Sequence, residues 1–214
     1  MDSGRKKFEH ILSQNLLPRD GLAYVAKSFF PGSDADRILG QLIGLTPWRQ
    51  DPIKIFGRTV LQPRFTAWMG DAGVTYRYSG LTLEPISWSQ PVREVKDRIE
   101  AEYGYKFNSA LLNYYRDGQD SMGWHRDNEP ELGEEPAIAS LSLGESRVFK
   151  MRHYFNKSLN IDLNLEHGDL LIMAGPMQAY WEHSLPKTAR PKGPRVNITF
   201  RSRLSTKFLL DVRG

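Results

Sequence analysis

Three side chains in this sequence could together bind a metal ion: His125 and Asp127, which are separated by one residue, and His183 further along the chain. Two imidazoles and one carboxylate on one face of an ion leave octahedral positions open for a co-substrate and O2, the arrangement used in non-haem Fe(II) chemistry. The chain has no cysteine, so histidine and carboxylate must supply any metal site, and these donors favour iron or manganese over structural zinc. A His-x-Asp pair alone is a weak signal, since a lone histidine is more often a surface or core residue.

Residues 195–201 predict a strand with one apolar and one polar face, because side chains alternate along a strand. The polar face carries Arg195, Asn197, Thr199 and Arg201. Guanidinium groups pair with carboxylates through forked hydrogen bonds, so two arginines and an amide suit a small dicarboxylate. Asn113 and Tyr115 repeat the polar alternation on the strand before His125. The alternative is a pair of solvent-exposed strand faces.

A third group of residues combines aromatic and apolar side chains with nearby cations. Tyr76 and Tyr78 alternate with Thr75 and Arg77, and Ile55-Phe56 precedes a turn at Gly57. Flat side chains can hold an unstacked base, and apolar wedges can fill the gap that it leaves in a duplex. The alternative is ordinary core and cross-strand packing.

The composition is that of an ordinary globular protein. The 214 residues are 40% hydrophobic and 25% charged, which fits one domain or one domain with a small appendage. The first residues form no signal-peptide pattern and the chain has no long apolar run, so we expect a cytoplasmic protein with no membrane span. A net charge of +4 is compatible with a polyanionic partner.

Periodicity predicts helices first and strands later. Helical apolar spacing covers residues 6–17, 20–30 and 33–43, and a further helix is expected over 91–104, with Pro91 in its first turn and Gly104 closing it. From Pro52 the period changes to two. After residue 106 we expect strands over 107–115, 137–143, 147–152, 160–165, 169–173, 180–183 and 195–201. Short strands separated by turns favour a mainly β protein with flanking helices, built as a barrel or a double-sheet jelly roll.

Taken together, these motifs resemble the AlkB-type Fe(II)/2-oxoglutarate-dependent nucleic-acid dealkylases over roughly residues 53–201. Within that family the chain is most similar to the branch that contains the mammalian nuclear enzyme for duplex-DNA repair. The resemblance rests on Gly70-Asp71-Ala72-Gly73-Val74-Thr75-Tyr76, Leu112-Asn113-Tyr114-Tyr115, His125-Arg126-Asp127-Asn128-Glu129, Ile138-Ala139-Ser140-Leu141-Ser142-Leu143-Gly144, His183-Ser184-Leu185-Pro186 and Pro194-Arg195-Val196-Asn197-Ile198-Thr199-Phe200-Arg201.

The resemblance implies a role for each matching residue. It implies a double-stranded β-helix in which His125, Asp127 and His183 bind catalytic iron. Residues implied to hold 2-oxoglutarate are Asn113, Tyr115, Arg195, Asn197 and Arg201. Residues implied to hold a flipped base or to enter the duplex are Tyr76, Tyr78, Glu129, Ile55 and Phe56.

The resemblance also implies a reaction and a partner. With Fe(II), 2-oxoglutarate and O2, N-methyl groups of 1-methyladenine and 3-methylcytosine in DNA would leave as formaldehyde, while 2-oxoglutarate becomes succinate and CO2. The cationic bases suit the carboxylate of Glu129. The partner would be alkylated single- or double-stranded DNA, or RNA, bound by a monomer, and a bacterial enzyme of this kind would associate with the nucleoid.

Two other functions remain open at this point. One is a hydroxylase or demethylase with the same cofactors that acts on RNA, a protein or a small molecule. The other is a non-catalytic module that binds damaged DNA. For the domain organisation, we expect residues 1–51 to be a helical extension packed on the core, and residues 52–214 to hold a base-recognition lid and the jelly-roll catalytic domain.

Overall fold

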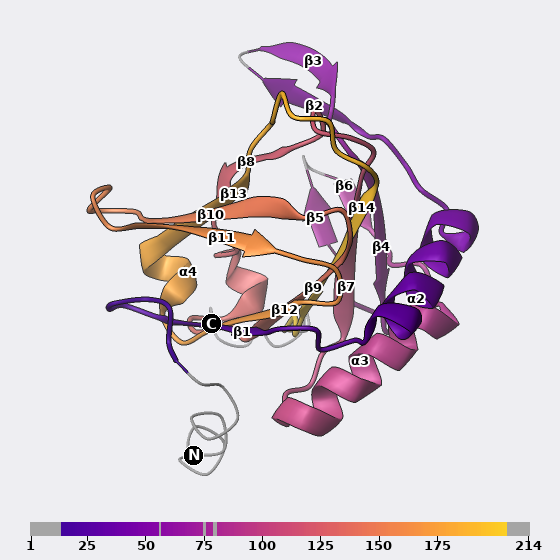
Figure 1. Ribbon diagram of the computed structural model, residues 1–214, viewed down its shortest axis with the longest axis horizontal. Helices are drawn as coiled ribbons and strands as arrows, with labels where there is room; N and C mark the ends of the chain where they lie inside the picture. Colours follow the sequence, from indigo (N-terminus) through magenta and orange to yellow (C-terminus); the bar gives the residue numbers. More distant parts are fainter. Residues whose placement is uncertain (1–13, 56, 75, 79–80, 205–214) are drawn as a thin grey trace.

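Figure 1 shows the computed structural model of the chain, which describes residues 14–55, 57–74, 76–78 and 81–204. For residues 54–55, 76–78 and 81–83 it describes the backbone alone. No helix in these ranges is long and apolar enough to cross a membrane.

Two antiparallel sheets form the body of the protein, as expected for a jelly roll. The six-stranded main sheet has the order β1 (Leu22–Ala26), β12 (Leu170–Ala174), β9 (Ile138–Gly144), β14 (Arg195–Arg201), β7 (Ser109–Tyr115) and β4 (Phe65–Gly70). The four-stranded minor sheet has the order β11 (Asn160–Leu165), β10 (Arg147–His153), β13 (Trp181–Leu185) and β8 (Met122–His125). From β7 onwards the chain passes back and forth between the two sheets, which places residues distant in sequence on facing strands.

Two separate hairpins accompany the sheets. One pairs β2 (Pro52–Ile55) with β3 (Arg58–Leu61), and the other pairs β5 (Tyr76–Tyr78) with β6 (Leu81–Leu83). The β2–β3 hairpin projects from the top of the molecule in Figure 1. A 3-10 turn, η1 (Pro130–Leu132), and a single helical turn, α4 (Met177–Tyr180), lie in the loops after β8 and β12.

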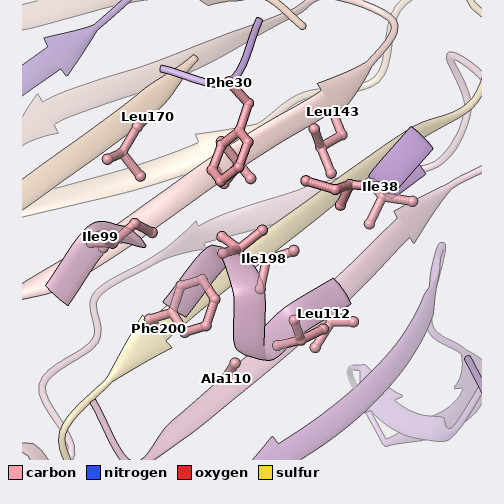
Figure 2. Packing of buried hydrophobic residues seen from close by; sticks show 14 of the residues in the cluster. Phe30, Ile38, Ile99, Ala110, Leu112, Leu143, Leu170, Ile198 and Phe200 are labelled. Carbon is pink, nitrogen blue, oxygen red and sulfur yellow. The ribbon is translucent and has the colours of Figure 1, made fainter. Parts of the chain in front are cut away.

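Two helices cover the outer face of the main sheet: α2 (Gly32–Leu45) and α3 (Gln90–Tyr103). Helix α3 has Pro91 in its first turn and ends at Gly104, whose left-handed φ of 74° suits glycine. Apolar residues of both helices, such as Ile38 and Ile99, pack with Ile198 and Phe200 of β14, as Figure 2 shows. Each large side chain buried here contributes roughly 1.5–3 kcal/mol, so this packing fixes which face of β14 points outwards.

The strand and helix predictions after residue 31 agree with the structure to within a few residues. The expected strand over 195–201 coincides with β14, and the one over 160–165 with β11. The helix expected over 33–43 lies within α2, and that over 91–104 matches α3 with its terminal glycine.

The expected helix over residues 20–30 was wrong. That segment contains β1, which pairs with β12 from Leu22↔Ala174 to Ala26↔Leu170. The backbone N–H of Ala23 also donates to the side chain of Asn15, at 2.9 Å. Partners far along the chain therefore override the local helical spacing. Of the helix expected over 6–17, residues 1–13 lie outside the described residues, and residues 14–17 are not helical.

Candidate active site

The side chains of His125, Asp127 and His183 come together between the two sheets. His125 ends β8, Asp127 follows it, and His183 on the neighbouring β13 is the register partner of His125. One ligand atom from each of the three residues lies within 4.8 Å of the others, and the two imidazole centroids are 4.2 Å apart. The structure thus brings together the three donors that the sequence singled out.

Both histidines are suited to donate a lone pair to a metal. Nδ1 of His125 lies 2.9 Å from the carbonyl oxygen of Gly123, so a proton held there leaves Nε2 free as a ligand. His183 is 3% exposed, and burial lowers its pKa to about 3, which keeps its ring neutral near pH 7. Its Nδ1 atom is buried and has no hydrogen-bond partner among the described residues.

Arg201 holds Asp127 as an ionised carboxylate, and Gln178 holds its backbone. Burial acts to raise its pKa, but the charges of Arg201, His183 and His125 and a hydrogen bond from Arg201 lower it to about 2. The Nη2 atom of Arg201 donates to Oδ2 of Asp127 at 2.7 Å, and within the described ranges Oδ1 accepts no hydrogen bond. The backbone N–H of Asp127 donates to Oε1 of the buried Gln178 on α4, at 2.9 Å. Orientation by these partners is typical of metal-binding carboxylates.

The polar face of β14 lines the same pocket as the metal-binding cluster. The residues from β7 and β14 in this lining are Leu111, Asn113, Tyr115, Arg195, Asn197, Thr199 and Arg201. Arg195 and Asn197 are 2% and 7% exposed, so the alternative of a solvent-exposed strand face is excluded. The helices cover the apolar face of β14, and the alternating polar face therefore points into the jelly roll.

The two arginines of this pocket differ in how their charge is balanced. Arg201 forms an ion pair with Asp127 at the metal end. Arg195 lies at the other end, where Nη2 donates to the neutral hydroxyl of Ser142 at 2.9 Å. Its Nε is buried and has no hydrogen-bond partner within the described ranges, and burial lowers the pKa of Arg195 to about 10. A buried cation with an unused donor is suited to receive a carboxylate from a ligand.

The amides of this pocket are partly occupied by internal hydrogen bonds. The Nδ2 atom of Asn197 donates to Oγ of Ser140 and to the carbonyl of Leu141, at 2.8 and 3.0 Å. Oδ1 of Asn113 accepts a hydrogen bond from Nε of Arg64 at 2.8 Å. These contacts fix the orientation of both amides before any ligand binds.

Only part of the predicted base-binding group can be placed. Ile55 lies on β2, and Tyr76 and Tyr78 lie on β5, but the structure describes only their backbone. Phe56 lies outside the described residues. Glu129 follows the metal-binding cluster and is half-buried, and its Oε2 has no hydrogen-bond partner in the described part of the chain.

Several residues of the site were not predicted from the sequence. The ring of Phe149 on β10 stacks on His183 with centroids 5.3 Å apart, and Ser140 and Ser142 of β9 contact Asn197 and Arg195. For Phe149, the alternation of side chains along the strand expected over 147–152 could have indicated that its ring points inwards. Gln178 had no such signal, since α4 is a single turn.

A comparison with known families identifies this arrangement. The family model described as "2OG-Fe(II) oxygenase superfamily" matches residues 22–201, which span both sheets and the whole pocket. The chain belongs to this superfamily. Fe(II) and 2-oxoglutarate are accordingly the cofactors of this protein, and the residues of the pocket fit both of them. Two neutral imidazoles and an ionised carboxylate suit Fe(II), and the unused Nε of Arg195 suits the second carboxylate of 2-oxoglutarate.

Several curated proteins are similar to this 2OG-Fe(II) oxygenase. "Alpha-ketoglutarate-dependent dioxygenase alkB homolog 3" of Homo sapiens is 44% identical over 186 residues, which cover 81% of this chain and 64% of that protein. "DNA oxidative demethylase ALKBH2" of Mus musculus is 39% identical over 201 residues, or 89% and 84% of the two chains. The chain thus spans about two thirds of the length of the alkB homolog 3 relatives. A solved structure entitled "The structure of OsALKBH1" has the same fold, with a TM-score of 0.56, 22% identity, and coverage of 84% of this chain and 97% of that chain.

Proposed function

We propose that this protein is an Fe(II)/2-oxoglutarate-dependent dioxygenase that removes N-methyl groups oxidatively from bases of nucleic acid, with 1-methyladenine and 3-methylcytosine in DNA as its substrates. The observation that carries the proposal is the placement of a three-donor metal cluster and an unbalanced buried arginine in one pocket. The names of two similar proteins, a dioxygenase and a DNA oxidative demethylase, support the choice of reaction and substrate.

In this proposal His125, Asp127 and His183 hold the iron, and the register partners Arg195 and Tyr115 receive the carboxylate of 2-oxoglutarate that lies away from the metal. Asn113 and its register partner Asn197 lie nearer the metal end, where Arg201 is fixed by its ion pair with Asp127. Bound Fe(II) and 2-oxoglutarate would supply the oxidation of a methyl C–H bond by O2, with formation of succinate and CO2. The hydroxymethyl product then loses formaldehyde, and the N–C bond electrons return to the base nitrogen.

The protein contributes orientation, charge and exclusion of water. Phe149 stacks on His183 and closes one side of the pocket with an apolar surface. Glu129 carries a buried carboxylate oxygen with no described partner, which suits a base that is cationic because it is alkylated. Removal of the methyl group also removes that positive charge, so Glu129 would favour the alkylated base over the repaired one.

The direct test is formaldehyde and succinate production from matched oligonucleotides. We expect turnover on 3-methylcytosine or 1-methyladenine DNA that requires Fe(II) and 2-oxoglutarate, and loss of turnover in His125→Ala with DNA binding largely retained. Failure of the wild-type protein to act on either lesion would reject the DNA substrate. Stimulation by a methylated RNA, peptide or small molecule instead would support the second hydroxylase function.

A second experiment tests the role of Glu129. Glu129→Gln keeps the size of the side chain and removes its charge. We expect its KM for cationic 3-methylcytosine DNA to rise about tenfold, with a smaller change for neutral 1,N6-ethenoadenine DNA. Equal changes for the two lesions would contradict an electrostatic role for Glu129.

A further inference from the structure

Arg147 is a buried arginine that no step of the proposed reaction uses. It lies on the inner face of β10, on the same side of the strand as Phe149 and Met151, and is 3% exposed. Phe149 stacks on His183, so this inner face forms one wall of the active-site pocket. Arg147 does not itself line that pocket.

The guanidinium of Arg147 joins two loops through three hydrogen bonds. Nη1 donates to the carbonyl of Asp117 at 2.9 Å, and Nη2 donates to those of Asp120 and Pro186, at 2.9 and 2.7 Å. The first loop leads from Tyr115 at the end of β7 into β8, and the second leads from β13 towards Arg195 at the start of β14.

The two loops also pack closely against each other. The backbone N–H of Thr188 donates to the carbonyl of Gly118 at 2.9 Å. A Cβ added to Gly118 would lie 2.7 Å from the carbonyl oxygen of Thr188, so no larger residue fits there without a shift. Arg147 therefore fixes the backbone on both sides of the pocket end that contains Tyr115 and Arg195.

The charge of Arg147 is not cancelled by an ion pair among the described residues. Its three hydrogen-bond partners are neutral carbonyls, and the nearby carboxylate of Asp120 is already paired with Arg116, at 2.7 Å. The carboxylate of Asp117 accepts a hydrogen bond from the backbone N–H of Gln119, and its charge offsets that of Arg147 only in part. Glu145 is likewise paired with Lys192. Burial lowers the pKa of Arg147, which is the sign of a cation that lacks full compensation.

This incompletely compensated charge acts on the neighbouring pocket residues. It contributes, after burial, to the lowered pKa of Arg195, and it opposes the rise in the pKa of Tyr115 that burial causes. Two buried cations thus repel each other at the end of the pocket away from the metal, whereas Arg201 at the metal end is paired with Asp127. An anion bound beside Arg195 would relieve this repulsion.

We propose that Arg147 is a positioning residue which makes the pocket selective for a co-substrate with a second carboxylate, through its charge and its hold on the loops beside Tyr115 and Arg195. This inference rests on the proposed use of 2-oxoglutarate. The group that Arg147 helps to select is therefore the carboxylate of 2-oxoglutarate that does not reach the metal.

The test compares 2-oxoglutarate with 2-oxovalerate, which has the same carbon chain but lacks the second carboxylate. Isothermal titration calorimetry on the full chain loaded with Mn²⁺ gives the ratio of the two Kd values without turnover. Arg147→Gln keeps amide donors but loses the charge. In this variant we expect the Kd for 2-oxoglutarate, divided by the Kd for 2-oxovalerate, to rise about tenfold. In Arg147→Lys, which keeps the charge but loses the forked donors that hold the loops, we expect a smaller shift of the ratio in the same direction, together with a lower melting temperature.

Arg152→Gln is the matched control. Arg152 lies on the same strand but pairs with Glu182 at 2.6 Å, on the opposite face from Phe149, and its substitution should leave the ratio unchanged. Equal weakening of both ligands in R147Q, or no weakening of either, would overturn the inference. Should R147Q fail to fold, R147K decides: a ratio shifted against 2-oxoglutarate, with the affinity for 2-oxovalerate kept, supports the inference, and an unchanged ratio rejects it. If the wild-type protein does not bind 2-oxoglutarate, the proposed function fails instead.

Discussion

Gln178 offers a sharp test of how the protein orients its metal ligand. Its side chain is 1% exposed, and Oε1 accepts a hydrogen bond from the backbone N–H of Asp127 at 2.9 Å. Among the described residues, the amide nitrogen faces only a weak acceptor, the sulfur of Met173 at 3.9 Å. Gln178→Met has nearly the same size and removes the acceptor, so the buried N–H of Asp127 loses its partner.

The expected magnitude follows from that single lost bond. A buried donor left without a partner costs about 1–3 kcal/mol of folding stability. Loss of a group that orients a metal ligand typically weakens metal binding about 10–100-fold. We therefore expect Q178M to weaken Mn²⁺ binding at least about tenfold and to lower the free energy of unfolding by about 1–3 kcal/mol.

Calorimetric titration with Mn²⁺ and urea unfolding of the metal-free protein measure the two effects separately. Asn15→Leu is the control, because Oδ1 of Asn15 accepts hydrogen bonds from the backbone N–H groups of Leu17 and Ala23, and none of these three residues lines the active-site pocket. It should lose stability and keep metal affinity. Unchanged Mn²⁺ affinity in Q178M, or equal losses of affinity in both variants, would refute an orienting role for Gln178.

Three further predictions concern the fold that supports the site. Ile198→Ala should lower the free energy of unfolding by about 2–5 kcal/mol and Ile198→Val by only about 0.5–1.5 kcal/mol, because Ile198 is fully buried between β14 and the helices; a small loss in I198A by urea unfolding would contradict this packing. Gly168→Ala should lower the melting temperature more than Gly104→Ala. Both glycines have left-handed φ, of 83° and 74°, but of the two only Gly168 would place the added Cβ 2.2 Å from a carbonyl oxygen, that of Phe30. Equal losses of melting temperature would show that the clash is relieved. Burial raises the pKa of Glu100, but hydrogen bonds from Lys106, Phe107 and Lys96 lower it below 4.5, so its contribution to stability is present above pH 4.5 and is lost as the pH falls through the folded-state pKa. Glu100→Gln should therefore weaken the fall of the free energy of unfolding with decreasing pH. Urea unfolding at several pH values below 5 measures this pH dependence, and an unchanged dependence in the variant would contradict the prediction.

Local sequence determined a large part of the site. Alternation along residues 195–201 was sufficient to place Arg195, Asn197 and Arg201 on one face, because side-chain direction in a strand depends only on the parity of the position. The absence of cysteine limited the donor set to histidine and carboxylate, and the three donors His125, Asp127 and His183 were correctly grouped. Short strands separated by turns likewise predicted the jelly roll.

The tertiary structure decided which partners those residues have. Nothing near residue 22 indicates β12 as a neighbour, and this long-range pairing turned an expected helix into β1. The ion pair between Arg201 and Asp127 joins residues 74 positions apart, and the hydrogen bond that the backbone N–H of Asp127 donates to Gln178 spans 51 positions. Such contacts arise only when the chain crosses between the sheets, because hydrogen bonding and charge depend on distance in space, whereas periodicity reports only the direction of a side chain from its own backbone.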